Sequence, residues 1–276
     1  MRNVFAANRM RLRKSRALWV CMGIVFLFTV YMVLSGYNNA LRYGSEMALE
    51  DYIFGVLPFG GLILSAFFAL FLGTEFGDGT VRNKIIAGRS KAEIYLANLL
   101  TCFLGCTAIF LAWTIGGFVG IPFFGLWKIG AKAYLVKIIV DYISALSLTA
   151  LLVPVCHLIA NKAICAVVSI FTEFGILLAG SYFYNALCEP EMVQEYITIS
   201  QEEGVVFGDL VPNPAYIGGR LRTVYQWMLN LLPSGQQIWV ADEPVTEPVK
   251  MCLCSLAVIA AATGIGLALF RRKELK

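Results

Sequence analysis

Long apolar stretches alternate with short polar segments along the sequence. Six of the stretches are long enough to cross a bilayer as helices of about 20 residues; they cover residues 18–35, 53–73, 94–117, 134–160, 163–184 and 249–270. Segment 118–130 is also apolar, but Pro122 and several glycines favour a shallow turn there. We therefore predict an all-α integral membrane protein, a single domain over residues 1–276 with six transmembrane helices.

Composition and the distribution of charge fit this prediction and orient it. Of 276 residues, 59% are hydrophobic and 14% are charged, far from the average for soluble domains. Basic residues gather in segments 2–16, 82–91 and 271–276. Acidic residues gather in the alternate segments, at Glu46, Glu50, Asp51, Glu189, Glu191, Glu195, Glu202, Glu203 and Asp209. Because basic loops stay inside, we expect both termini to be cytoplasmic, and the basic clusters require no nucleic acid partner.

The first 17 residues are basic and only partly amphipathic. A helix here would place Met1, Val4, Phe5 and Leu12 loosely on one side, with arginines elsewhere. This predicts a short interface helix on an anionic inner leaflet, although a plain positive anchor fits equally well. We expect no cleaved signal, because the apolar run that follows is long and has no convincing small-x-small cleavage site.

Residues 74–93 form a charged, capped segment between the second and third apolar stretches. Residues 78–80 (DGT) offer N-cap chemistry, and Gly88 stands where a helix would need a left-handed residue to end. Ser90 and, three residues on, Glu93 form a capping-box pattern that starts the next helix. The pattern predicts a short helix at a tight corner, which is either a lever for a partner or a solvated turn.

Parts of this segment resemble a known family of membrane proteins. The matching pieces are residues 75–76 (EF), 79–84 (GTVRNK), 88–90 (GRS) and 94–96 (IYL). They resemble the first cytoplasmic loop of the membrane subunits of type-2, export-class ABC transporters, especially the small permeases of Gram-positive bacteria. Looser similarity runs along all six apolar stretches.

The resemblance implies a function that the residues alone do not show. In that family the loop docks into a groove of a separate ATPase subunit. It thus implies a cytoplasmic coupling helix, two ATP-binding subunits that hold ATP and Mg, and a second copy or paralogue of the permease. It also implies a bacterial plasma membrane and export of a drug-like or antimicrobial peptide compound. The coupling residues that it implies are Glu75, Gly79, Thr80, Arg82, Asn83, Lys84, Gly88 and Arg89.

Several ionisable side chains fall inside the apolar stretches. Glu173 lies at the centre of the fifth, where a charge costs roughly 2.5–3.5 kcal/mol on insertion scales. We expect it to face protein, water or a partner, either in structural pairing or in a substrate path. Lys137 and Asp141 are one helical turn apart and can pair or snorkel. His157 fits a hydrogen-bonded packing position better than a proton relay.

Segment 185–248 precedes the last apolar stretch and is expected to be external. Its first half is acidic, and residues 212–214 (PNP) then break the chain. Apolar residues recur at helical spacing after the break, at Leu221, Val224, Tyr225, Met228 and Leu232. This periodicity predicts an external amphipathic helix before the last span.

Motifs for chemistry are missing from the sequence. Neither a phosphate-binding G-x-x-x-x-G-K-[ST] loop nor an H-E-x-x-H motif occurs. With one histidine in the chain, we expect neither a nucleophile and base pair nor a metal site. We therefore expect no enzyme activity and no cofactor in this chain. Two alternatives to the permease stay open: an ion-coupled secondary transporter, and a non-transporting membrane scaffold or sensor subunit.

Overall fold

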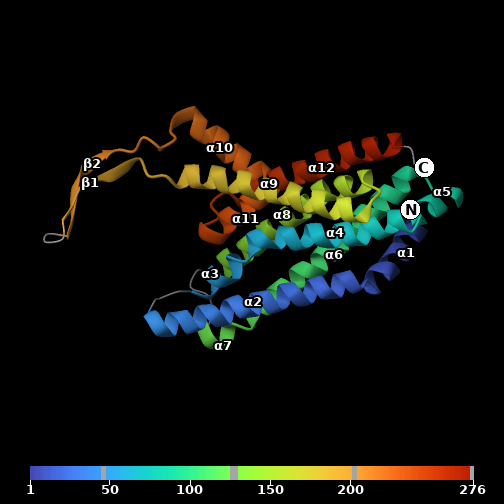
Figure 1. Ribbon diagram of the computed structural model, residues 1–276, viewed down its shortest axis with the longest axis horizontal. Coiled ribbons are helices and arrows are strands. Elements are labelled where there is room, and N and C mark those ends of the chain that lie inside the picture. The colour runs from blue at the N-terminus through green and yellow to red at the C-terminus, as the bar shows by residue number, and fades with distance from the viewer. Residues whose placement is uncertain (45–47, 125–129, 201–203, 274–276) are drawn as a thin grey trace.

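The computed structural model describes residues 1–44, 48–124, 130–200 and 204–273, without the side chains of residues 124, 195–200 and 204–207. Of the acidic residues singled out in the sequence, Glu46, Glu202 and Glu203 and the side chain of Glu195 lie outside this description. The elements are α1 (Arg2–Arg13), α2 (Arg16–Tyr43), α3 (Leu49–Phe54), α4 (Leu57–Gly77), α5 (Thr80–Ile86), α6 (Lys91–Phe118), α7 (Ile121–Phe124), α8 (Ala131–Leu158), α9 (Lys162–Cys188), β1 (Met192–Ser200), β2 (Gly204–Pro212), α10 (Gly219–Leu231), α11 (Pro233–Asp242) and α12 (Pro248–Arg272) (Figure 1).

Six helical segments of the described chain are long and apolar enough to cross a membrane. They are α2, α3 with α4, α6, α8, α9 and α12, so the six predicted stretches are confirmed as helices. All six run along the long axis of the molecule, and both chain ends lie at the end that carries α5 (Figure 1). The β-strands lie beyond the opposite end (Figure 1). This is the architecture of a helical multi-pass membrane protein.

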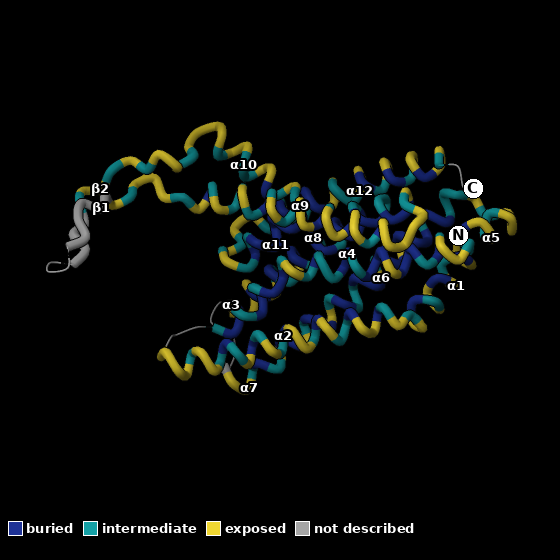
Figure 2. The backbone as a smooth tube through the Cα atoms, viewed as in Figure 1, coloured by how far each residue is buried: buried dark blue, intermediate teal, exposed yellow. Residues whose placement is uncertain are grey.

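The six helices form a buried centre and an apolar periphery. Of the most apolar 18 residues, 56% are buried in α3 with α4, in α6 and in α8, against 22–28% in α2, α9 and α12. The buried positions accordingly run through the middle of the bundle, and exposed positions follow its outer helices (Figure 2). Exposed apolar side chains on the outer helices, such as Leu27, Phe171 and Leu253, suit contact with lipid.

Two helices differ from their predicted bounds. Helix α2 continues through the polar residues after position 35 and ends at Gly44, whose φ of 63° is the left-handed conformation typical of a helix C-terminus. The second span is divided, because α3 ends before Gly55 and α4 begins with Pro58 in its first turn. Proline lacks an N–H group and is tolerated there, whereas inside one continuous helix it would remove a hydrogen bond.

Helix α1 confirms a helix in the first 17 residues and shows what its inner face contacts. Val4, Asn8 and Leu12 follow one another at four-residue spacing and are buried. Helix α1 packs against α6, and the amino group of Met1 lies 2.8 Å from Oε1 of Glu93. This face of α1 therefore contacts protein, and the arginines of α1 lie on its other sides.

The segment between α9 and α12 contains a sheet that the sequence pattern did not predict. Strands β1 and β2 form an antiparallel hairpin, with register from Met192 opposite Pro212 to Ser200 opposite Gly204. Residues 192–200 (MVQEYITIS) are rich in β-branched and aromatic residues, which favour strands over helices. Helix α10 appears where the amphipathic helix was predicted, and Leu221, Val224 and Met228 stay exposed on it.

Helix α11 is a short helix inserted into the bundle. Most of it is buried, at Pro233, Ser234, Gly235, Gln236, Gln237, Ile238 and Val240. It packs against α8 and α9 and also touches α4. Gly180 of α9 faces the backbone of Gly235, so the two helices approach at a distance that only glycine allows. A polar segment is thereby brought into contact with the intramembrane carboxyl groups.

Candidate functional site

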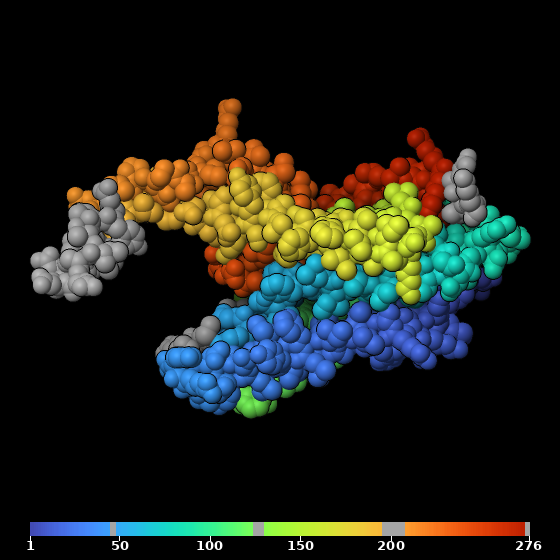
Figure 3. All heavy atoms as spheres, viewed as in Figure 1, coloured from blue at the N-terminus to red at the C-terminus, as the bar shows by residue number. Residues whose placement is uncertain are grey.

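The predicted coupling segment is a rigid corner at one tip of the molecule (Figure 3). Gly79 and Gly88 have φ values of 68° and 77°, and these left-handed residues set the turns on either side of α5. Ser90 caps α6 by accepting a hydrogen bond from the N–H group of Glu93 at 3.2 Å, as predicted. Asp78 does not cap α5, because Gly79 occupies the N-cap position and Asp78 ends α4.

A buried carboxylate lies beneath α5. Glu75 is 1% exposed and accepts charged hydrogen bonds from Arg11 of α1, at 3.1 Å, and from Lys84 of α5. The hydroxyl group of Thr80 donates to the backbone oxygen of Glu75 at 2.8 Å. The Arg11 guanidinium also stacks over Phe71, 4.1 Å from its ring centroid. Two cations thus compensate the charge of one buried carboxylate. Without them, burial of this charge would strongly destabilise the fold.

Hydrogen bonds continue from this ion pair into the bundle. The Lys84 ammonium donates to Oδ1 of Asn8 at 2.9 Å, and Nδ2 of Asn8 donates to Oδ1 of Asn98 at 2.6 Å. Nδ2 of Asn98 lies 3.1 Å from Nε2 of His157, whose Nδ1 lies 2.8 Å from the backbone oxygen of Val153. A neutral imidazole with its proton on Nδ1 satisfies both contacts. The structure therefore gives His157 a hydrogen-bonded packing position.

The end of α12 is attached to the same corner. Nζ of Lys273 donates to the backbone oxygen of His157 at 2.8 Å, and Nζ of Lys91 donates to the backbone oxygen of Lys273 at 2.6 Å. The Lys273 ammonium also lies 4.7 Å from the ring centroid of Phe76. Partial burial lowers the pKa of Lys273 below its ordinary value. Helices α1, α4, α5, α6, α8 and α12 thus meet in one polar network.

The residues that the resemblance implies for coupling divide into two groups. Glu75, Thr80 and Lys84 point into the network, whereas Arg82, Asn83 and Gly88 are exposed on the outside. Arg89 and Gly79 are partly buried.

Ile86 completes the outer group and was missed in the sequence. Its side chain is 74% exposed, while Val81 of the same helix is buried. The sequence could have shown this, because Val81 and Ile85 are four residues apart and lie on the inner face of α5. Ile86 is then on another side of the helix.

Glu173 faces protein in the middle of the bundle. It is fully buried, and the hydroxyl group of Ser234 on α11 donates to its Oε1 at 2.8 Å. Gly61 of α4 leaves room for the carboxyl group, since a Cβ atom at this position would collide with it. Oε2 of Glu173 has no hydrogen-bond partner. Of the settings expected for this residue, protein contact is the one found.

The Ser234 contact gives a testable result for Glu173. We expect Glu173→Gln to unfold at nearly the wild-type denaturant concentration, because a glutamine oxygen accepts the same hydrogen bond. Glu173→Ala should lower the free energy of unfolding by about 1–3 kcal/mol, since it leaves the Ser234 hydroxyl buried and unpartnered. Unfolding in mixed micelles measures both. Equal loss in the two variants would show that the charge, and not the hydrogen bond, stabilises this site.

Of the two arrangements expected for Lys137 and Asp141, pairing or snorkelling, the pair is not formed. Both oxygens of Asp141 are buried without a hydrogen-bond partner. Nζ of Lys137 lies instead 5.1 Å from the ring centroid of Phe54 on α3. Helix α3 lies toward the end of the bundle away from α5 (Figure 1). Asp141 is therefore left without a counter-charge from the residue one turn away.

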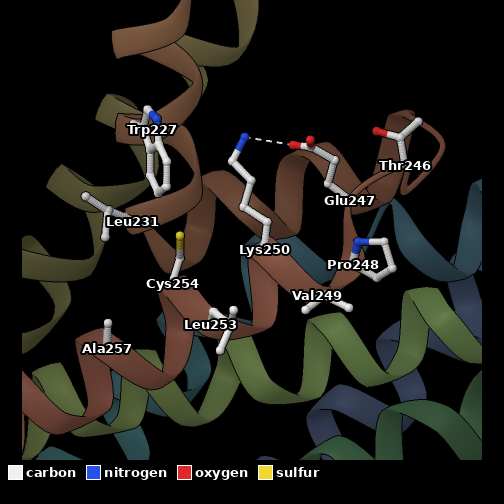
Figure 4. Close-up of a pocket in the computed structure, with 10 residues that line it drawn as sticks. All are labelled: Trp227, Leu231, Thr246, Glu247, Pro248, Val249, Lys250, Leu253, Cys254 and Ala257. Atoms are coloured by element: carbon white, nitrogen blue, oxygen red, sulfur yellow. Dashed lines mark hydrogen bonds and ion pairs between the residues drawn. The ribbon is translucent and has the colours of Figure 1, made fainter.

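A groove of about 660 Å³ opens on the surface between α10 and α12 (Figure 4). Trp227 and Leu231 form one side and Leu253 lies on its floor (Figure 4). Lys250 stands at its rim, paired with Glu247 at 2.7 Å. An apolar floor with a charged rim suits a lipid molecule of the bilayer better than a polar substrate.

Fold and corner together define a class: a helical multi-pass membrane protein with a short, exposed helix locked between two spans. Comparison of the chain with protein-family models and with curated proteins finds no match. The particular function is therefore argued from the geometry and from the sequence resemblance.

Proposed function

We propose that this chain is the membrane-spanning permease subunit of an ATP-driven exporter of the type-2 ABC class. It would lie in a bacterial plasma membrane with both termini in the cytoplasm, paired with a second permease copy or paralogue. The basic segments at the chain ends and around α5 support this orientation, because positive loops stay inside. The chain ends also lie at the same end of the bundle as α5 (Figure 1).

The observation that carries the proposal is the two-sided construction of α5. Its inner side is tied through Lys84 and Glu75 to α1 and α4, and further hydrogen bonds lead to α6 and α8. Its outer side presents Ile86 and Arg82 to a partner. A force on the outer side would therefore move several spans together, as coupling to a separate ATPase requires. A solvated turn would need no such network.

The outer side also defines the chemistry of the partner. Ile86 suits an apolar pocket, and Arg82 beside it suits acidic side chains at the rim of that pocket. We propose an ATP-binding subunit, in two copies, that holds ATP and Mg and offers such a groove. From the resemblance alone, the substrate is proposed to be a drug-like or antimicrobial peptide compound.

Copurification tests the docking side. Tagged chain is isolated in mild detergent from its native host, associated proteins are identified by mass spectrometry, and ATPase activity of the eluate is measured. We expect an ATP-binding subunit with the wild type and a loss of more than about tenfold in its recovery with either Arg82→Glu or Ile86→Asp. Ile86→Asp removes a buried anchor, which costs more than about 1.4 kcal/mol, and Arg82→Glu places a like charge against acidic side chains. Arg9→Glu, an exposed arginine of α1, is the control. Unchanged recovery with both α5 variants would refute docking through α5.

A second candidate is an ion-coupled secondary transporter. It is favoured by one observation: the carboxyl groups of Asp141 and Glu173 lie inside apolar spans with oxygens that have no hydrogen-bond partner. Reconstituted vesicles distinguish the two functions. Transport that requires ATP and the partner subunit supports the exporter, and transport driven by an ion gradient without ATP supports the second candidate.

A further inference from the structure

A small, partly open cavity lies in the bundle between α2, α4, α6, α8 and α11. Its volume is about 50 Å³, and its walls are mostly apolar, with Leu57, Leu64 and Trp113 among them. Two polar side chains line it, Asp141 of α8 and Gln237 of α11. Because one water molecule needs about 10–15 Å³ by such a measure, the space has room for a small ion with a little water. It is too small for a drug-like compound.

Three oxygen atoms of this cavity accept no hydrogen bond within normal distance. Asp141 is 1% exposed, and neither of its oxygens has a hydrogen-bond partner. The side-chain oxygen of Gln237 is likewise buried and unpartnered. Three oxygen atoms are thus withdrawn from water, and the amide group of Gln237 is the neighbouring polar group of Asp141 in this cavity. A buried ionised carboxylate is stable only when a positive charge compensates it.

The missing charge is a single one. Asp141 is the one carboxylate among the residues that line the cavity. A divalent cation would leave an excess positive charge in an apolar surrounding, and such cations usually take several carboxylates. A monovalent cation leaves the site neutral.

A larger cavity is lined by other residues of the same two helices, α8 and α11. It occupies about 960 Å³ and is lined by Glu50, Asp51, Asp242 and Glu243, against Lys132 and Lys137. Helices α3 and α11, which carry three of these carboxylates, lie toward the end of the bundle away from α5 (Figure 1). Lys137 of this mouth and Asp141 below it are one turn apart on α8. Asp242 of the mouth and Gln237 of the small cavity are both on α11. The two cavities are therefore stacked along α8 and α11, and the excess of carboxylates attracts cations to the upper one.

We infer that the cavity at Asp141 and Gln237 is a binding site for one small monovalent cation, filled through the acidic mouth above it. The cation is either an alkali ion held by the carboxylate or a proton that bonds to it, and each neutralises the single negative charge. Lys137 lines the mouth one helical turn from Asp141, and its positive charge repels an entering cation. The other titratable groups around the site are Cys106 of α6 and Glu173 of α9, together with the mouth residues.

Thermal unfolding of the purified full-length chain in lipid nanodiscs tests this inference. In one series NaCl or KCl replaces N-methylglucamine chloride at constant ionic strength. In the other, pH is varied without alkali ions. For an alkali ion, we expect a saturable rise of the unfolding temperature in the wild type. The apparent affinity should be at least tenfold weaker in Gln237→Leu, and Asp141→Asn should show no rise of the unfolding temperature. For a proton, wild-type stability should fall relative to Asp141→Asn as pH rises, with no alkali effect.

A matched variant and one outcome complete the test. Glu247→Gln makes the same carboxyl-to-amide change outside both cavities and should follow the wild type. Lys137→Met should bind the cation more tightly, since a repelling positive charge is removed. If Asp141→Asn follows the wild type in both series, no exchanging cation occupies the site and the inference is overturned. ATPase subunits take no part, so this result is independent of the proposed export function.

Discussion

Replacing Lys84 by glutamate is expected to destabilise the whole chain by about 3 kcal/mol or more. The variant removes one of the two cations that neutralise buried Glu75 and places a second carboxylate beside it. Breaking one side of a buried ion pair usually costs about 3–5 kcal/mol, and a like charge adds to this. The bond from Lys84 to Asn8 is lost as well. Titration with denaturant in mixed micelles measures the effect.

Two variants separate this effect from a general response to charge. Lys84→Met keeps the apolar stem and leaves Arg11 paired with Glu75, so a smaller loss is expected. Arg82→Glu makes the same reversal of charge on the exposed side of α5 and should change stability by less than about 0.5 kcal/mol. If Lys84→Glu unfolds at the same denaturant concentration as Arg82→Glu, Lys84 does not hold the corner. Loss of partner binding in a Lys84 variant would then report docking.

Replacing Gly180 by valine should separate α9 from α11. A Cβ atom at this position would lie 2.8 Å from both Cα and N of Gly235, and the backbone cannot move aside as a flexible side chain can. Overpacking of this kind typically costs about 1–3 kcal/mol. The hydrogen bond from Ser234 to Glu173 lies between the same two helices and should weaken with it. We expect a lower unfolding temperature and reduced yield of folded protein.

Gly175→Val is the matched control, because it lies on the same helix and a Cβ atom there meets no other atom within 4 Å. Both substitutions change helix propensity by the same amount. Equal stability of the two variants would show that α9 and α11 are not in close contact in the membrane.

Much of the architecture could be predicted because its signals are local. A run of about 20 apolar residues has few alternatives to a membrane-spanning helix, and all six predicted runs are helices. The corner could also be predicted, because Gly88 follows the end of α5 and Ser90 caps the start of α6. The hairpin was not predicted, because acidic residues in segment 185–248 are typical of a loop and strand pairing depends on contacts between two separate runs.

The candidate sites needed contacts that are distant in the sequence. The resemblance implies the same docking role for Glu75 and Lys84. Their contacts with Arg11 and Asn8 show that both face protein, which a short charged helix does not reveal in the sequence. His157 obtained its place only from Asn98, on another helix.

By itself, the sequence determined the helical membrane class, the number of apolar helices and the position of the short helix between the second and third spans. Apolar length and capping residues act within a few turns, so they can be read along the chain. Only the tertiary structure decided which side of α5 is anchored, that α11 enters the bundle, and that Asp141 has no partner from Lys137. These features depend on which helix faces are brought together, and packing of the complete bundle determines that.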